Sequence, residues 1–348
     1  MTITVFVGTG GVGKTTVAAA TALARARAGQ KCVVLTIDPA WRLRQALGLK
    51  AESVEQRVEL DPPPAGELWA AMLDVRATLD EAVRTHGDRG IQERILNHPI
   101  YGTIADSLSG MQELMAVERI DQLARHGFDN IVVDTAPSRH AFEFLDKPSA
   151  FAELAGSNWV KLIGRTYKFV EATGLLSLGR ATMDVYRRVE SILGATLVSQ
   201  VLDFYSIFVS IAEGYAERAR GTTALFRNPQ VTDFRVVSTP GKAIRDATFF
   251  ADALGERNLS MGAFYINRVW RLEPGPVQAH GAAAEVLDWY EGVRLSHQAA
   301  VDTLTAEFGA RVANIVTLPE LDGDVEGVAE LERIAQLMPR VLDTGGGH

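Results

Sequence analysis

The chain has 348 residues, of which 47% are hydrophobic and 22% charged, and its formal net charge is -8. This composition predicts a soluble chain with a large core, and the length allows two domains. The acidic balance argues against a general nucleic-acid binder, because such proteins neutralise phosphates with Lys and Arg. The single cysteine, Cys32, excludes an internal disulfide and any zinc site built on a cysteine pair of this chain.

The first residues, MTITVFV, predict a strand and not a signal peptide, because a basic flank and a small-residue cleavage site are missing. We therefore expect a cytoplasmic protein. The apolar run over 3–7 is followed by a glycine-rich loop and by an Ala-rich helical pattern over about 14–28. This order indicates a strand, a loop and a helix at the start of the chain.

Further apolar runs of strand character alternate with helical patterns along the chain. The second run, 32–37, ends at Asp38, and the third, 131–133, ends at Asp134 after a helical stretch over 111–127. Later runs of the same kind lie at 234–238, 262–267 and 314–318. The pattern predicts an α/β fold with a doubly wound, mainly parallel sheet. Ligands of such sheets bind at the carboxyl ends of the strands, where Gly8, Asp38 and Asp134 fall.

The loop GTGGVGKTT, residues 8–16, fits the phosphate-binding pattern G-x-x-x-x-G-K-[ST] through Gly8, Gly13, Lys14 and Thr15. Glycines let backbone N–H groups approach phosphate oxygens, and the following helix adds its N-terminal dipole. We expect Lys14 to pair with the β- and γ-phosphates and Thr15 to bind Mg²⁺. The predicted nucleotide-binding residues in this loop are Gly10, Gly11, Val12, Gly13, Lys14, Thr15 and Thr16.

Two acidic residues close apolar strands and are candidates for the chemistry beside the loop. Asp134 is placed as a Walker-B acid. We expect Thr15 to bind the Mg²⁺ ion directly and Asp134 to bind it through a water molecule. Asp38 is the candidate for orienting the attacking water. Its alternative role is that of a helix N-cap beside Pro39.

Three segments carry a family resemblance: GTGGVGKTT, TIDPAWRLRQALG (36–48) and VVDTAPSRHAFEFL (132–145). They resemble the P-loop, switch I and switch II of the ArsA/Get3 family of deviant Walker-A ATPases, which have a SIMIBI-type P-loop NTPase fold. The resemblance spans most of the chain. It implies ATP and Mg²⁺ as ligands, catalytic roles for Asp38 and Lys14, and γ-phosphate sensing by the segment from Asp134 to Pro137.

The resemblance also implies that Asn267, at the end of a strand, contacts adenine. The alternative for Asn267 taken alone is an ordinary turn residue at the strand end. The guanine-reading motif N-K-x-D is missing from the sequence, and ATP is therefore favoured over GTP.

The sequence departs from the family pattern at several positions. Thr9 replaces the signature lysine that reaches a partner's phosphates across a dimer, Trp41 replaces the histidine of switch I, and switch II continues as Ser138, Arg139 and His140. His140 alone is more often a structural residue than a catalytic one. Arg42 or Arg139 could supply the missing positive charge. The alternative is that both are solvated surface arginines.

A chain with Cys32 as its only cysteine has neither the zinc-binding pair of Get3 dimers nor the cysteines that hold arsenite in ArsA. We therefore expect no zinc and no arsenite transport. The sequences of the motifs most resemble a bacterial, especially actinobacterial, branch of this family. In that branch an ATPase with a GKGG loop is paired with one that has a GTGG loop. The expected partner is a second copy of this chain or a GKGG-type paralogue.

The predicted organisation is a P-loop core over 1–148 and 230–343, with helical segments near 76–126. A helical subdomain over 149–229 is inserted into this core, and 344–348 form a disordered tail. Gln200 and Asp203 argue against a transmembrane helix within 192–212. In Get3 the corresponding subdomain holds client transmembrane segments. The alternative is that these apolar helices are buried within their own subdomain.

Two classes of function fit these observations. The first is a nucleotide-switched dimer that handles hydrophobic or membrane-linked client proteins. The second is a positioning ATPase of the MinD/ParA kind that cycles on a membrane or nucleoid. The last helical pattern, 325–342, mixes acidic and basic residues instead of forming a basic amphipathic membrane helix. The first class is therefore favoured, with indirect membrane contact and no nucleic-acid partner.

Overall fold

A computed structural model of the chain describes the residues 1–37, 42–49, 53–102, 111–136, 142, 145–146, 200, 203–204, 207, 218, 220–259, 261–270, 280–309, 312 and 314–338. The chain divides into two compact units. The first unit comprises Met1–Leu73, Leu123–Ala141 and Leu225–His348, and the second comprises Asp74–Gln122 and Phe142–Ala224.

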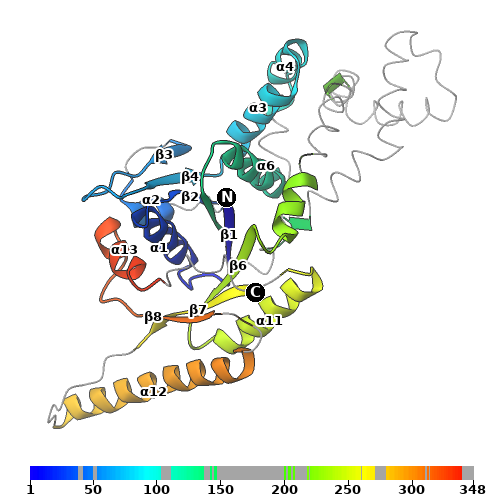
Figure 1. The fold of residues 1–348 in the computed structure, drawn as a ribbon. Coiled ribbons are helices and arrows are strands. Elements are labelled where there is room, and N and C mark those ends of the chain that lie inside the picture. Colours follow the sequence, from blue (N-terminus) through cyan, green and yellow to red (C-terminus); the bar gives the residue numbers. More distant parts are fainter. Residues whose placement is uncertain are drawn as a thin grey trace. The chain divides into compact units, whose positions relative to one another are not determined.

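The first unit is built on an eight-stranded sheet with the order β3-β4-β2-β5-β1-β6-β7-β8 (Figure 1). All neighbouring strands are parallel except β3 and β4. This arrangement confirms the predicted mainly parallel α/β fold. The strands are β1 (Thr2–Val7), β2 (Lys31–Thr36), β3 (Glu55–Arg57), β4 (Glu67–Met72), β5 (Asn130–Asp134), β6 (Thr232–Ser238), β7 (Met261–Val269) and β8 (Asn314–Pro319).

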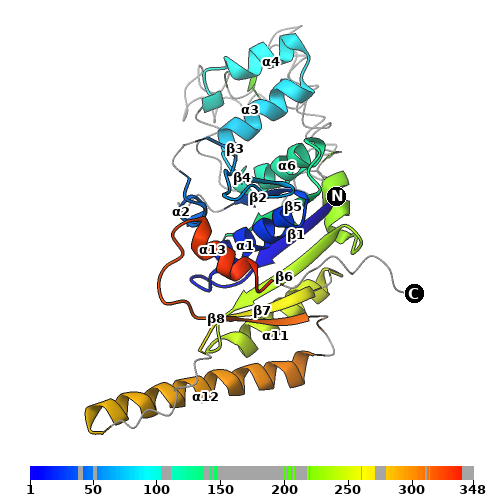
Figure 2. The same ribbon diagram turned by 60° about the vertical axis from the view of Figure 1, so that its left-hand side comes forward.

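Helices cover both faces of this sheet (Figures 1 and 2). The helix α1 connects β1 to β2, and α11 connects β6 to β7 in the opposite direction along the sheet. Because such crossovers are right-handed, α1 and α11 lie on opposite faces. The helices α2 and α13 pack beside α1, and α12 packs beside α11. These helices are α1 (Lys14–Arg27), α2 (Arg42–Leu47), α11 (Ala243–Glu256), α12 (Ala282–Phe308) and α13 (Val328–Ala335).

The central strands are mainly apolar because helices cover both faces of the sheet. All five residues of β5 are buried, and β1 and β2 are buried except at their first residue. The sequence pattern did not predict β3 and β4. The strand β4, ELWAAM, contains no β-branched residue, and β3 has only three residues with partial exposure, so neither gives a clear strand signal.

The second unit contains α3 (Val75–His86), α4 (Arg89–Leu96) and most of α6 (Met111–Arg125), in the region where the sequence predicts helices. Asp74 and Asp88 cap the first two of these helices through hydrogen bonds of 2.8 and 2.9 Å from backbone N–H groups. No helix in the described part of the chain is both long enough and apolar enough to cross a bilayer.

Most of the predicted helical subdomain, 149–229, lies outside the described residues, as does the predicted tail 344–348. The second unit groups the helices after residue 74 with 142–224, whereas the sequence analysis assigns the segments near 76–126 to the P-loop core. The predicted domain boundaries therefore stay a prediction.

The thiol of Cys32 is fully buried in β2, and burial raises its pKa to about 12. At pH 8 the reactive thiolate is then about one part in ten thousand of the total. We expect Ellman's reagent to leave the native protein unmodified at pH 8 and to titrate one thiol after unfolding in guanidinium. Rapid modification of the native protein, with its melting temperature unchanged, would contradict this burial.

Candidate functional site

The glycine-rich loop between β1 and α1 lies close to neighbouring backbone and side chains. A Cβ on Gly8 would lie 2.3 Å from the carbonyl oxygen of Val237, so only glycine fits there. Gly13 is the N-cap of α1 with a φ of 88°, in the left-handed region that favours glycine. Gly13 has no side chain that could cap the helix, and the N-terminus of a helix favours the binding of an anion.

Lys14 is the first residue of α1, and its side chain returns towards the loop. Its Nζ atom donates a hydrogen bond of 3.2 Å to the carbonyl oxygen of Thr9, and the residue is only 6% exposed. The ammonium group is therefore held beside the N–H groups that open the helix. Both features favour the binding of a negatively charged group at this point.

Asp134 is the last residue of the buried strand β5, and it is only 1% exposed. Its Oδ2 atom accepts hydrogen bonds from the hydroxyls of Thr15, at 2.7 Å, and Thr36, at 3.2 Å. The backbone N–H of Ile37 donates to the Asp134 carbonyl oxygen at 2.9 Å. The end of β2 therefore leads the chain past Asp134 just before the segment that contains Asp38.

The oxygen atoms of Thr15 and Asp134 fit a Mg²⁺ ion. This cation prefers oxygen ligands and keeps several water molecules, with one or two carboxylates and the substrate phosphates completing its shell. Over the described residues, no group of three or more His, Cys, Asp or Glu side chains gathers as a metal site.

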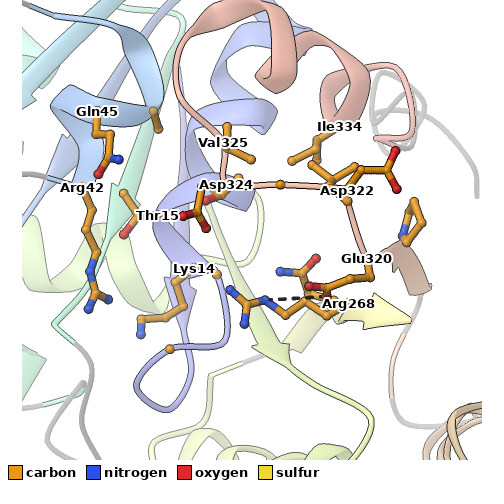
Figure 3. Close-up of a pocket in the computed structure, with 18 of the residues that line it drawn as sticks. Lys14, Thr15, Arg42, Gln45, Arg268, Glu320, Asp322, Asp324, Val325 and Ile334 are labelled. Carbon is orange, nitrogen blue, oxygen red and sulfur yellow. Dashed lines mark ion pairs between the residues drawn. The ribbon is translucent and has the colours of Figure 1, made fainter. Parts of the chain in front are cut away.

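A cleft of about 700 Å³ opens over the loop and the start of α1 (Figure 3). Its size is that of a typical small-ligand site. The walls come from α1, α2, the ends of β7 and β8, and the segment 319–325. Six of the predicted nucleotide-binding residues line the cleft: Gly11, Gly13, Lys14, Thr15, Thr16 and Asn267. Of the other two, Gly10 is exposed in the loop, and Val12 is buried beneath it.

Asn267 connects the end of β7 to the loop. Its Nδ2 atom donates a hydrogen bond of 2.9 Å to the carbonyl oxygen of Val12. The next residue, Arg268, has a φ of 62°, which turns the chain at the edge of the cleft. Its Nε atom lies 3.9 Å from Oε2 of Glu320 (Figure 3). The sequence pattern did not indicate this ion pair.

Further parts of the cleft wall come from α2 and from the acidic segment after β8. Arg42 lines the cleft with an exposed side chain, one turn before Gln45. Gln45 donates a hydrogen bond of 3.0 Å to Glu326. Asp322 and Asp324 also line the cleft. They lie in the loop after NIVTLPE (314–320), which resembles the family segment that covers the base, but neither residue was named individually from the sequence.

Other predicted site residues lie outside the described residues: Asp38, Pro137 and Arg139, together with Trp41, Ser138 and His140. Their roles stay predictions. The sequence analysis did not predict two hydrogen bonds of the site, one between Thr36 and Asp134 and one between Thr9 and Asp246. A polar residue at the buried end of β2 was a signal for the first, whereas 237 positions separate the partners of the second.

Comparison with known proteins identifies the family. The family described as anion-transporting ATPase matches residues 1–340. The putative arsenical pump-driving ATPase 1 of Aquifex aeolicus is 24% identical, over 97% of this chain and 78% of that protein. ATPase get3 of Schizosaccharomyces pombe is 22% identical, over 97% and 92%. The arsenical pump-driving ATPase of Escherichia coli is 26% identical, over 44% of this chain and 26% of its own length.

The family match spans nearly the whole chain and agrees with the phosphate-binding loop, the mainly parallel sheet and the buried Asp134. The resemblance to the ArsA/Get3 ATPases is thereby confirmed. This chain belongs to the anion-transporting ATPase family and is an ATPase.

Proposed function

We propose that the cleft binds Mg-ATP and that its hydrolysis drives a nucleotide-switched dimer that handles hydrophobic or membrane-linked client proteins. The observation that carries the nucleotide part is the hydrogen bond of 2.7 Å between Thr15 and the buried Asp134, beside Lys14 at the N-terminus of α1. Together these residues provide an anion site and a cation site next to each other. A magnesium-bound triphosphate needs both.

In this proposal the loop N–H groups and the Lys14 ammonium bind the phosphates. Thr15, and Asp134 through a water molecule, would hold a Mg²⁺ ion, which would neutralise phosphate charge. Asp38 orients the attacking water for in-line displacement. Asn267 and the segment 319–325 form the part of the cleft that remains for the nucleoside. Arg42, which lines the cleft, or Arg139 adds positive charge near the γ-phosphate.

A role other than arsenite transport is supported by the cysteine content. Arsenite and antimonite bind thiolates, and Cys32 is the only cysteine of the chain. Its thiol is buried within β2, and burial raises its pKa. A buried and protonated thiol is unsuited to form a soft-metal site.

The roles of Lys14 and Asp38 can be separated by substitution. Lys14→Ala removes a charge-assisted contact to phosphate and should weaken ATP binding by about tenfold to a hundredfold. Asp38→Asn keeps the size of the side chain but removes the carboxylate. It should bind ATP normally and lose turnover by about 10² to 10⁴-fold. Fluorescent-nucleotide titration and phosphate-release assays measure the two effects.

The matched control is Asp252→Asn, the same change at an exposed acidic residue of α11 that does not line the cleft. We expect it to retain the turnover of the parent, since the proposal gives Asp252 no contact with the nucleotide. Turnover of Asp38→Asn equal to that of the parent would show that another group orients the water.

The assembly part of the proposal depends on Thr9, whose hydroxyl donates to Asp246 of its own chain at 3.0 Å. A threonine cannot bring charge to a partner's phosphates, and a homodimer should therefore hydrolyse ATP slowly. A GKGG-type paralogue would bring a lysine to the nucleotide of this chain. Since a cation supplied in trans can add about 10³-fold to turnover, we expect at least about tenfold stimulation.

Steady-state ATPase assays with and without the paralogue test this pairing. A paralogue with its signature lysine changed to alanine is the control, and it should not stimulate. The pairing is refuted by fast turnover of this chain alone that persists in Arg42→Ala and in Arg139→Ala.

Client handling predicts that the apolar helical region changes its exposure with the nucleotide. Large exposed apolar patches usually mark binding surfaces. Hydrogen exchange over 150–228 should therefore differ between the ATP-analogue and ADP states. Equal strong protection in both states argues for a buried core instead. ATP-dependent co-sedimentation with liposomes or DNA would favour a positioning ATPase of the MinD/ParA kind.

A further inference from the structure

A buried carboxylate outside the magnesium site contacts the phosphate-binding loop. Asp246 lies in the first turn of α11 and is 3% exposed. Its Oδ2 atom accepts two hydrogen bonds, one of 3.0 Å from the hydroxyl of Thr9 and one of 2.7 Å from the hydroxyl of Ser238. Ser238 ends β6 and is fully buried. The loop is thus attached to α11 through one oxygen atom.

The main chain of Thr9 reaches the lysine of the loop. Its carbonyl oxygen accepts the hydrogen bond of 3.2 Å from Lys14 Nζ. On its other side Thr9 follows Gly8, where a Cβ would lie 2.3 Å from the Val237 carbonyl oxygen. Thr9 therefore has little freedom to move. A movement of the Thr9 backbone away from Asp246 would also displace the carbonyl group that accepts the hydrogen bond from the Lys14 ammonium.

We infer that Asp246 is a positioning residue of the ATPase, which acts on Lys14 through Thr9. The hydroxyls of Thr9 and Ser238 both donate to the same oxygen atom of Asp246, and this fixes their orientation. The inference rests on ATP hydrolysis in the cleft. It is independent of any client and of a paired subunit.

Two single variants test the contact between Thr9 and Asp246. Thr9→Val removes the hydroxyl but keeps the shape of the side chain and the carbonyl group. Asp246→Asn keeps the size but removes the charge. Because small displacements of a positioned group reduce turnover strongly, we expect each variant to lower kcat by about tenfold. Thr9→Ser retains the hydroxyl and should keep the parental kcat.

The double variant identifies the route of the effect. If both residues act through one hydrogen bond, Thr9→Val combined with Asp246→Asn should be no slower than the slower single variant. Asp252→Asn makes the same chemical change at an exposed position of α11 and should leave kcat unchanged. Melting temperatures of all variants show whether a loss of kcat follows a loss of stability.

Three results would overturn the inference. The first is a kcat of Thr9→Val equal to that of the parent, and the second is a loss of kcat in the double variant equal to the product of the two single losses. The third is a loss of kcat in Thr9→Ser as large as in Thr9→Val. If Asp246→Asn does not fold, the comparison of Val and Ser at position 9 decides alone. A parent protein without ATP turnover would refute the proposed chemistry of the cleft. An active parent with an unaffected Thr9→Val variant refutes only the role of Asp246.

Discussion

Burying a carboxyl group is costly unless hydrogen bonds replace its contacts with water, and Asp134 at the end of β5 is nearly inaccessible to water. The hydroxyls of Thr15 and Thr36 donate to one of its oxygen atoms, at 2.7 and 3.2 Å. These donors come from α1 and β2, which flank β5 in space. The contact exists only if β1, β5 and β2 are neighbours in register, and the parallel sheet provides this.

The phosphate-binding loop lies between two carboxylates with different surroundings. Asp134 contacts the hydroxyl of Thr15 at the beginning of α1, where a cation and a nucleotide would share the cleft. Asp246 contacts the hydroxyl of Thr9 near the beginning of the loop and is covered by α11 and β6. The first carboxylate is suited to bind a metal ion. The second contacts the loop at Thr9, away from Thr15, and is suited to hold the loop in place.

The position of Thr9 connects the chemistry of the site to the family pattern. Relatives with a lysine at this position are expected to extend a charge beyond their own subunit, whereas the Thr9 side chain forms a hydrogen bond within its own chain. A short hydroxyl side chain can stabilise the loop, but it brings no charge to a neighbouring nucleotide. Thr9 thus makes a contact within its own subunit, which agrees with the proposed division of roles between paired ATPases.

The sequence by itself determined the parts of the protein that depend on local pattern. The loop from Gly8 to Thr15 has its glycines where the backbone needs them, and the continuous apolar strands predict a covered parallel sheet. The sequence did not predict the strand β4, because its apolar residues are not β-branched and are equally typical of a helix. Only the tertiary structure decided which distant residues meet, such as Asn267 with Val12 and Asp246 with Thr9. Those contacts depend on the order of the strands in the sheet, which brings together side chains from β7, α11 and the loop that no local pattern connects.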